Sequence, residues 1–149
     1  MDILTPAERS KNMAAIRGKD TKPELYIRKL LFSKGYRYRI GSSAVEGHPD
    51  IYLSKYKTAV FIHGCFWHRH IGCKYAYMPK SRIEFWTKKF KANIQRDKTV
   101  RLLLEQSRIK NLIIWECTIK RMKKSHEYEE KIFNEIEQFF YSKDLYLEL

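Results

Sequence analysis

The pattern of apolar and polar positions predicts a small sheet. Residues 36–40 alternate aromatic and basic side chains, as a half-exposed strand does. The apolar runs 50–53 and 58–62 are separated only by the short segment 54–57, so they should pair as an antiparallel hairpin. A further apolar run, 111–117, indicates a buried strand.

Apolar positions at helical spacing predict four helices around these strands. Two of the helices begin with a capping box, in which Thr is followed by Pro and then by Glu, and they cover about 5–16 and 21–35. A long basic helix should run from about 82 to 108, and a last helix should begin near Ser125. The apolar positions are Leu25, Leu30 and Leu31, expected to face inward; Ile83, Trp86, Phe90 and Ile94, at helical spacing; and a core stripe of Ile132, Phe133, Ile136, Phe139 and Phe140.

The order of these elements, ααβββαβα, indicates an α/β fold with a mixed sheet flanked by helices. The chain shows no internal repeat or linker, so residues 1–149 should form a single domain. The longest apolar runs are too short to span a bilayer, and the N-terminal residues lack the features of a signal peptide. We therefore expect a soluble, cytoplasmic protein.

The net charge indicates which class of partner the chain binds. The chain carries 30 Lys and Arg against 17 Asp and Glu, which gives a formal net charge of +13. Such an excess favours a polyanion, because each neutralised phosphate releases a condensed counterion. An acidic membrane surface is the alternative, but the sequence has no basic amphipathic anchor and no lipidation signal. Nucleic acid is the better interpretation.

The candidate chemistry is concentrated in the stretch 63–73, HGCFWHRHIGC, which directly follows an apolar run. Three of the chain's 5 histidines and two of its 3 cysteines lie here. An odd number of cysteines in an unexported chain suits a metal site better than a disulfide framework. The cluster should lie where a strand leaves the sheet.

Four residues of the chain form a candidate zinc set. Cys65, His70 and Cys73 have the spacing C-x4-H-x2-C, and Cys117 on the later strand would complete the four ligands that a structural zinc ion takes. The loop has few apolar residues with which to fold by burial, so a metal ion would have a structural purpose there. The alternative is that Cys117 is an ordinary buried thiol and that the loop cysteines are incidental.

The remaining histidines and two acids form a candidate catalytic set. If zinc uses His70, His63 and His68 are free, although a single histidine is more often a packing or surface residue. A nuclease needs carboxylates to hold Mg²⁺, and acids stand out in so basic a chain. Asp50 begins the hairpin strand and Glu24 lies in a capping box; a turn and a helix cap explain the same two residues equally well.

Pro49-Asp50 on a hairpin strand, preceded by a helix with an early Glu, resembles the PD-(D/E)xK class of nucleases. That class carries Glu-x-Lys on the next strand, where this chain has Phe61-Ile62-His63. An imidazole therefore replaces the lysine, and no carboxylate is offered at this position.

The chain also resembles one family closely, the very short patch repair DNA mismatch endonucleases. Its most specific motif is His-Gly-Cys-Phe-Trp-His at 63–68. The resemblance implies a restriction-endonuclease-like α/β fold, related to the PD-(D/E)xK class, with a variant active site. The other matching segments are Arg9-Ser10-Lys11-Asn12-Met13, Lys19-Asp20-Thr21-Lys22-Pro23-Glu24, Gly47-His48-Pro49-Asp50, Arg82-Ile83-Glu84-Phe85-Trp86 and Trp115-Glu116-Cys117.

The resemblance implies a role for each residue of the candidate catalytic set. Asp50 would be the principal Mg²⁺ ligand, and the main-chain carbonyl of Ile62 would be a second contact. Family members can carry Thr at this position. The main-chain carbonyl is present with Ile as well, so this ligand would be kept. His68 would act as general base or orient the water, with His63 and Glu24 assisting.

The resemblance also implies a structural zinc ion and a wedge for DNA. Phe66 and Trp67 would enter the duplex from the major groove at a T:G mismatch, and Met13 would enter from the minor groove. Residues 1–20 would then be a DNA-contacting helix and arm. Apolar wedges exploit the lower cost of unstacking a mismatched step, whereas the alternative for all three is core packing. The implied zinc ligands are Cys65, His70, Cys73 and Cys117, with Gly72 an added residue relative to some members.

The implied reaction is a Mg²⁺-dependent nick 5′ of the T in T:G mismatches left by deamination of 5-methylcytosine, which begins very short patch repair. Mismatch-repair proteins and a cytosine methyltransferase would be partners, and cutting one strand suits a monomer. One alternative is a related nuclease of the same fold with another mismatch or duplex specificity. The other is a zinc-stabilised DNA-binding module without catalysis.

Overall fold

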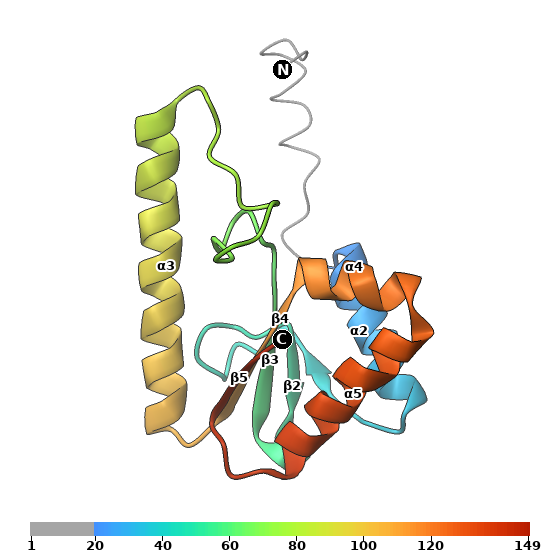
Figure 1. The fold of residues 1–149 in the computed structure, drawn as a ribbon. Helices are drawn as coiled ribbons and strands as arrows, with labels where there is room; N and C mark the ends of the chain where they lie inside the picture. The colour runs from blue at the N-terminus through green and yellow to red at the C-terminus, as the bar shows by residue number, and fades with distance from the viewer. Residues whose placement is uncertain (1–19) are drawn as a thin grey trace.

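The computed structural model describes residues 20–149 and contains one mixed sheet of five strands in the order β1-β2-β3-β4-β5 (Figure 1). Neighbours β1, β2 and β3 are antiparallel, whereas β3, β4 and β5 are parallel. The first predicted helix and Met13 lie outside the described residues. The strands are β1 (Arg39–Ile40), β2 (Ile51–Leu53), β3 (Thr58–His63), β4 (Lys110–Trp115) and β5 (Tyr146–Glu148).

The predicted hairpin is confirmed. β2 and β3 are joined by a single 3-10 turn, and Ile51 pairs with Val60. Lys57 closes the turn in the left-handed conformation, with φ of 47°. β4 then pairs with β3 along its whole length, so that His63 lies beside Trp115 at one edge of the sheet. This edge carries the candidate site.

Helices cover both faces of the sheet, as the sequence predicts for an α/β fold (Figure 1). Side chains alternate along the buried strands: Val60 and Leu112 pack into the core under α2, α4 and α5, whereas Phe61 and Ile113 pack on the side of α3. The alternation explains why the central strands read as continuous apolar runs. The helices are α2 (Lys22–Ser33), α3 (Ile83–Gln106), α4 (Glu116–Lys124) and α5 (His126–Tyr141).

The last helix follows the prediction closely. Ser125 caps α5, and its Oγ accepts a hydrogen bond of 3.2 Å from the N–H of Tyr128. All five residues of the predicted core stripe are buried. Acidic residues in the first turn suit the positive end of the helix dipole.

Four elements differ from the prediction, and two of them, α4 and β5, are not predicted by the sequence at all. β4 ends at Trp115, and Cys117 lies in the first turn of the short helix α4 rather than on a strand. The buried apolar residues of α4 are limited to Ile119 and Met122 among many basic residues. The pattern of apolar positions therefore does not predict this helix. β5 has only three residues and β1 only two, too few for an alternating pattern to identify their ends.

The inward face of α2 is more polar than the sequence suggests. Leu31 is buried, but Leu25 is 40% exposed, so the prediction that Leu25 faces inward is wrong. The buried positions near it are Glu24, Ile27 and Arg28. The helix therefore turns a carboxylate and a guanidinium toward the interior.

α3 extends beyond the sheet at its outer end (Figure 1). Phe90 is buried and Trp86 half-buried, but Ile83 and Ile94 are exposed. None of the described helices is both long and apolar enough to cross a membrane.

Candidate active site and metal centre

Asp50 lies at the start of β2, where the hairpin brings it next to the last residues of β3. Its Oδ2 accepts a hydrogen bond of 2.7 Å from the main-chain N–H of Ile62. Burial raises the pKa of Asp50 to about 6, and the charge of Glu24 adds to the rise. The Ile62 hydrogen bond and the charges of Arg28 and His68 oppose it. A buried carboxyl with this pKa is one that a cation would hold in its charged form.

Two of the candidate histidines form one stack. The rings of His63 and His68 are parallel within 4°, with centroids 3.8 Å apart. His63 is 7% exposed, and its Nδ1 has no hydrogen-bond partner among the described residues. Burial and the charge of His68 lower the pKa of His63 to about 3, although Asp97 opposes the shift. His63 is therefore neutral at physiological pH.

Asp97 completes this group and was not identified from the sequence. It lies in the middle of α3, and its Oδ2 is 2.7 Å from Nδ1 of His68. Asn93, one turn earlier, donates a hydrogen bond of 3.0 Å to the main-chain carbonyl of Trp67. A signal was present in the sequence, because Asp97 follows Phe90 and Asn93 at helical spacing on a helix with few acids.

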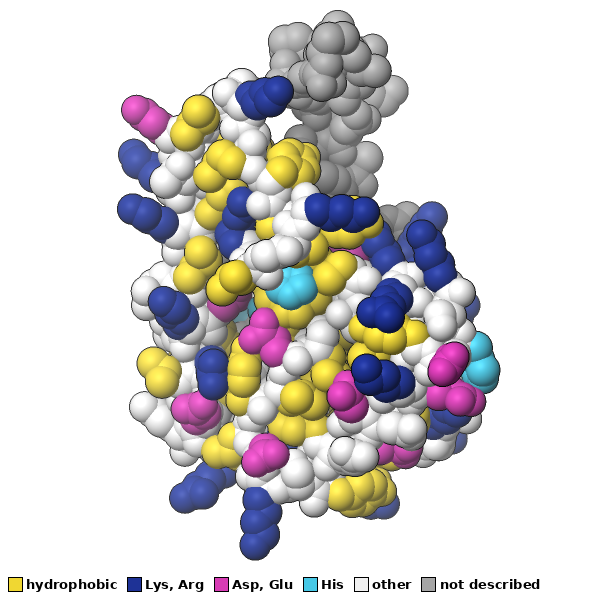
Figure 2. All heavy atoms as spheres, viewed as in Figure 1, with side chains coloured by type: hydrophobic (Ala, Val, Ile, Leu, Met, Phe, Trp, Pro, Cys, Tyr) yellow, Lys and Arg dark blue, Asp and Glu magenta, His cyan; other side chains and the backbone are white. Residues whose placement is uncertain are grey.

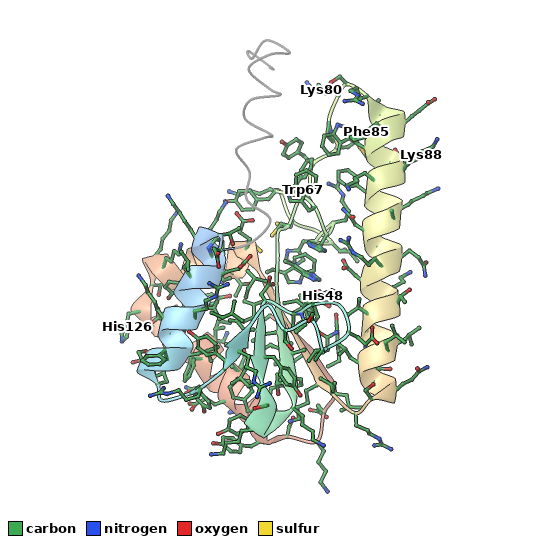
Figure 3. The ribbon with its side chains drawn as sticks, turned by 180° about the vertical axis from the view of Figure 1, so that it is seen from behind. His48, Trp67, Lys80, Phe85, Lys88 and His126 are labelled. Atoms are coloured by element: carbon green, nitrogen blue, oxygen red, sulfur yellow. The ribbon has the colours of Figure 1, made fainter. Side chains whose placement is uncertain are left out.

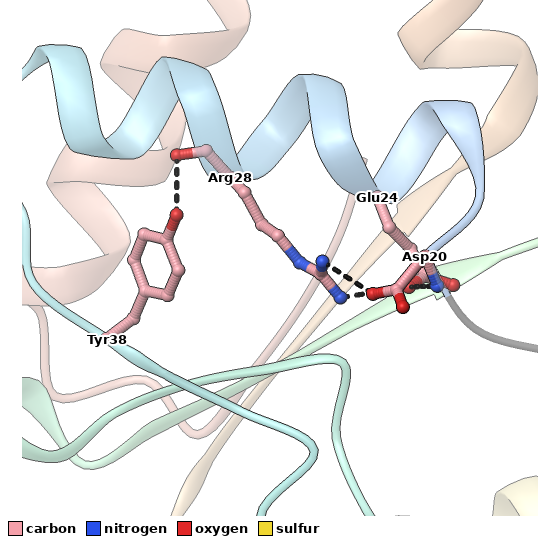
Figure 4. A network of polar contacts seen from close by, with 4 residues as sticks. All are labelled: Asp20, Glu24, Arg28 and Tyr38. Carbon is pink, nitrogen blue, oxygen red and sulfur yellow. Dashed lines mark hydrogen bonds and ion pairs between the residues drawn. The ribbon is translucent and has the colours of Figure 1, made fainter.

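Glu24 is close enough to affect Asp50, but its own hydrogen bonds lie elsewhere (Figure 4). It is 5% exposed, accepts a bond of 3.0 Å from the N–H of Asp20, and pairs with Arg28 at 3.3 Å. The predicted capping box does not form, because the Thr21 side chain makes no cap hydrogen bond and Glu24 accepts from the N–H of Asp20 and not from that of Thr21. Arg28 compensates a charge that would otherwise be buried alone.

The predicted zinc ligands come together. One ligand atom from each of Cys65, His70, Cys73 and Cys117 lies within 4.8 Å of all the others. Sγ of Cys117 is 3.4 Å from Nδ1 of His70. Cys117 reaches the cluster from the first turn of α4, which corrects the expectation of a strand position. Three thiols and one imidazole are a donor set that suits a tetrahedral zinc ion.

The thiols of this cluster cannot easily ionise together. Burial raises the pKa of Cys65 to about 12 and also raises the pKa of Cys117. Burial has the same effect on Cys73, but hydrogen bonds from the N–H groups of Tyr75 and Ala76 and from the other thiols outweigh it and lower the pKa. A bound cation would remove this conflict, because it stabilises every thiolate at once.

A second ring stack fixes His70. Its imidazole lies parallel to the Trp115 ring within 6°, at 4.1 Å between centroids. Nε1 of Trp115 donates a hydrogen bond of 2.7 Å to the carboxylate of Glu148 on β5. The edge strand therefore holds the tryptophan on which His70 rests.

Phe66 and Trp67 belong to an aromatic cluster with rings of α3, and Figure 3 shows Trp67 on the loop beside this helix. The Phe66 ring lies 5.2 to 5.4 Å from the rings of Trp67, Trp86 and Phe90. Both candidate wedge residues are half-buried. They are packed against neighbours in the free protein, and each leaves part of its ring accessible.

Comparison with known proteins adds independent evidence. The sequence model described as DNA mismatch endonuclease Vsr matches residues 1–74. The chain is 44% identical over 135 residues to the type II nicking enzyme V.NmeAIP of Neisseria meningitidis serogroup A, covering 91% of this chain and 96% of that protein. It is 37% identical over 123 residues to the DNA mismatch endonuclease Vsr of Escherichia coli, covering 83% and 78%. The type II nicking enzyme V.XorIIP of Xanthomonas oryzae is 38% identical over 118 residues.

Together with the mixed α/β fold, these similarities define the chain as a DNA endonuclease, a hydrolase that acts on DNA in repair. The chain belongs to the family of the DNA mismatch endonuclease Vsr. The resemblance that rested on the motif at 63–68 is therefore confirmed.

Proposed function

We propose that this endonuclease uses Mg²⁺ to nick the strand 5′ of the T in T:G mismatches left by deamination of 5-methylcytosine, and so begins very short patch repair. The observation that carries the proposal is that Asp50, bonded to Ile62 near the end of β3, feels the charge of His68, which stacks on His63 and meets Asp97 of α3. A carboxylate beside imidazoles of fixed orientation can hold a divalent cation and move a proton from water.

Asp50 is the proposed Mg²⁺ ligand, with the main-chain carbonyl of Ile62. Carboxylate and carbonyl oxygens are the donors that Mg²⁺ prefers, and a cation would offset the burial that raises the pKa of Asp50. The N–H and carbonyl of one strand residue point to the same neighbour, so the Ile62 carbonyl should face the Asp50 side. Bound Mg²⁺ would stabilise charge on the scissile phosphate and make an attached water more acidic.

His68 is the proposed general base. Hydrogen bonding from Nδ1 to Asp97 favours the tautomer whose Nε2 carries the lone pair, which can then accept a proton from the attacking water. The neutral ring of His63 stacks on His68 and restricts its rotation. Glu24 is the proposed assisting carboxylate, because its charge acts on Asp50 and would add to the negative potential that attracts a cation, while Arg28 compensates it in part.

We further propose that Cys65, His70, Cys73 and Cys117 hold a structural zinc ion. The ion would fasten the loop after β3 to the first turn of α4. The same loop contacts α3 through Asp97, so the zinc ion would help to position His68 without taking part in the reaction.

Phe66 and Trp67 are the proposed wedge. To enter a duplex they would exchange contacts within the aromatic cluster for contacts with bases, which costs least where a mismatch already weakens stacking. The role of Met13 as a second wedge stays a prediction. By family analogy we propose that the enzyme acts as a monomer in the cytoplasm, with mismatch-repair proteins and a cytosine methyltransferase as partners.

Cleavage of labelled duplexes tests the proposed function. Duplexes with one T:G pair, with each other mismatch and with full pairing are incubated with and without Mg²⁺, and the nick is located by sequencing. We expect a single nick 5′ of the mismatched T that requires Mg²⁺. Equal cutting of all duplexes would instead define a related nuclease of other specificity, and binding without cutting would define a DNA-binding module.

A further inference from the structure

The outer end of α3 and the loop before it form a surface that the proposed chemistry does not use. Figure 2 shows hydrophobic side chains next to Lys and Arg side chains over the outer end of α3. Figure 3 places Lys80, Phe85 and Lys88 there, with Trp67 further in along the loop. We refer to Tyr77, Lys80, Arg82, Phe85 and Lys88 as the aromatic-basic end.

The rings of the aromatic-basic end are exposed to an unusual degree. Tyr77 is 62% exposed and Phe85 is 45% exposed. Met78 and Ile83 beside them are also exposed. Neighbouring large apolar side chains on the surface of a highly charged protein mark a binding site, because leaving them in water is unfavourable.

These rings continue the aromatic cluster outward. Tyr77 lies 5.1 Å from Phe66, and Phe85 lies 5.2 Å from Trp86, which in turn contacts Trp67 at 5.7 Å. The series therefore leads from the proposed wedge to the surface. A base that is displaced next to the wedge would find a second ring on which to stack, about one ring-to-ring distance further out.

Arg69 fixes the loop that presents Tyr77. Its guanidinium donates hydrogen bonds to the main-chain carbonyls of Tyr77 at 3.0 Å and Ala76 at 2.7 Å. The same group lies 3.9 Å from the centroid of the buried Phe90 ring. The loop is thus held against α3, and Tyr77 does not need to be ordered by a ligand.

The charge around these rings suits a phosphate backbone. Between residues 71 and 91 the only acid is Glu84. The guanidinium of Arg82 lies over the Phe85 ring, 4.3 Å from its centroid, so a cation covers one face of this ring. Exposed rings among cations are the means by which proteins bind single-stranded nucleic acids. The basic residues of this segment are Lys74, Lys80, Arg82, Lys88, Lys89 and Lys91.

We propose that the aromatic-basic end binds unpaired nucleotides of the DNA strand, with bases on Tyr77 and Phe85 and phosphates on Lys80 and Arg82. The faces of bases are covered inside a paired duplex, so exposed rings are useful only where bases are unstacked. The inference rests on the proposed function, because the opened mismatch and the nicked strand supply the unpaired nucleotides.

The test is binding of a labelled oligothymidylate of about ten nucleotides, a length within the usual site size, and of a fully paired duplex of equal length. Fluorescence anisotropy is measured on the whole chain without added Mg²⁺. The variants are Tyr77→Ala with Phe85→Ala, Lys80→Ala with Arg82→Ala, and the conservative pair Tyr77→Phe with Phe85→Tyr. Leu102→Ala is the control, since Leu102 is an equally exposed apolar residue near the other end of α3.

We expect the ring-deleted variant to bind the single strand at least about tenfold more weakly, because two stacking contacts are lost. Its affinity for the duplex should change by less than about twofold, because the contacts with the phosphates remain intact. The charge-deleted variant should lose affinity and show a weaker salt dependence. The conservative pair and the Leu102→Ala control should bind as the unaltered protein does.

Unchanged single-strand binding in the ring-deleted variant would overturn the proposal, as would an equal loss on single strand and duplex. A dimer in light scattering that the ring-deleted variant fails to form would also overturn it, since the surface would then join two copies of the chain. If the double variant fails to fold by circular dichroism, Tyr77→Ala and Phe85→Ala are measured singly, with at least about fivefold loss expected for each.

The measurement needs neither a mismatch nor Mg²⁺, so it can be separated from nicking. Failure to nick a T:G duplex, with ring-dependent single-strand binding intact, contradicts the proposed function alone. Normal nicking with ring-independent binding contradicts this inference alone.

Discussion

Two ring stacks in the same loop show how differently one residue type can be used. His68 stacks on His63 at 3.8 Å and meets the carboxylate of Asp97, whereas His70 stacks on Trp115 at 4.1 Å and meets the thiol of Cys117. The difference comes from the partners, which are supplied by α3 in one case and α4 in the other. The chemistry of each histidine is therefore set by elements far away in the sequence.

The two groups also differ in the metal they suit. Asp50 offers a carboxylate with a main-chain carbonyl nearby, and hard oxygen donors favour Mg²⁺. The thiol cluster offers soft donors, which favour zinc. Under the proposed function, this separation of donor types would let one loop serve two ions without exchange between them.

The strongest test of this division is Asp50→Asn. We expect nicking of a T:G duplex to fall by about 10³-fold or more, as on loss of one member of a cooperating catalytic group. Zinc content should not change. The melting temperature above pH 6 should stay equal or rise, because ionising a buried carboxyl with a raised pKa costs stability there. Retained nicking would remove Asp50 from the reaction.

The second test acts on the other group. Cys117→Ala should abolish stoichiometric zinc binding and destabilise the fold by at least about 3 kcal/mol, because zinc binding contributes to folding. The melting temperature should drop by roughly 6–12 °C for a domain of this size. Chelation of the unaltered protein should reproduce the loss. A variant without zinc and with unchanged melting would contradict the structural role.

The variant Asp97→Asn tests whether Asp97 positions His68 for the reaction. We expect about a 10²-fold loss in nicking, since the amide no longer stabilises the tautomer of His68 that accepts a proton. Zinc content and melting should remain close to normal. Glu105→Gln is the matched control on α3, because the carboxylate of Glu105 pairs with Arg101 at the surface. Equal losses of nicking activity in both variants would mean that Asp97 acts only through its charge.

Trp67→Ala tests whether the ring next to the proposed general base His68 recognises the mismatch. The preference for T:G over paired duplex should fall by about tenfold, within the range for loss of one base-stacking contact. The rate on bound mismatch DNA should change less, because His68 keeps its contact with Asp97. Competition binding and single-turnover nicking measure the two effects. Unchanged discrimination would make Trp67 a packing residue.

The smallest expected effect is a shift in pH dependence. Protonation of Asp50, whose pKa burial raises to about 6, should reduce nicking as the pH falls through that value at low Mg²⁺. Protons and Mg²⁺ compete for the same carboxylate, so tenfold more Mg²⁺ should move the midpoint down by up to about one pH unit. An acid limb that ignores Mg²⁺ would assign the titration to another group.

Sequence reasoning located the thiol cluster because its ligands are rare and chemically distinctive. Three cysteines and one histidine leave little choice once zinc is considered, whichever element carries Cys117. It placed Cys117 on a strand because the apolar run 111–115 continues into residues that look compatible with one. The structure turns into α4 at Glu116 instead.

Asp97 was beyond the same reasoning for a physical reason. Acids on a basic helix are usually solvated, and no spacing in the sequence links Asp97 to His68. Only the packing of α3 against the loop brings the two side chains to 2.7 Å. The prediction that Leu25 faces inward was wrong for a related reason. Helix α2 buries the ion pair of Glu24 and Arg28, and a pattern of apolar positions does not predict that charged side chains are buried.

The loop after β3 bridges two helices that lie on opposite faces of the sheet. Asp97 and Asn93 hold it from α3, and Cys117 meets it from α4. All of these ties fall within residues 63–73, so the span that follows is anchored at its start and again at α3. Changes in length should therefore be tolerated between 78 and 81, beyond the carbonyls of Ala76 and Tyr77 that Arg69 holds, without disturbing the contact of His68 with Asp97.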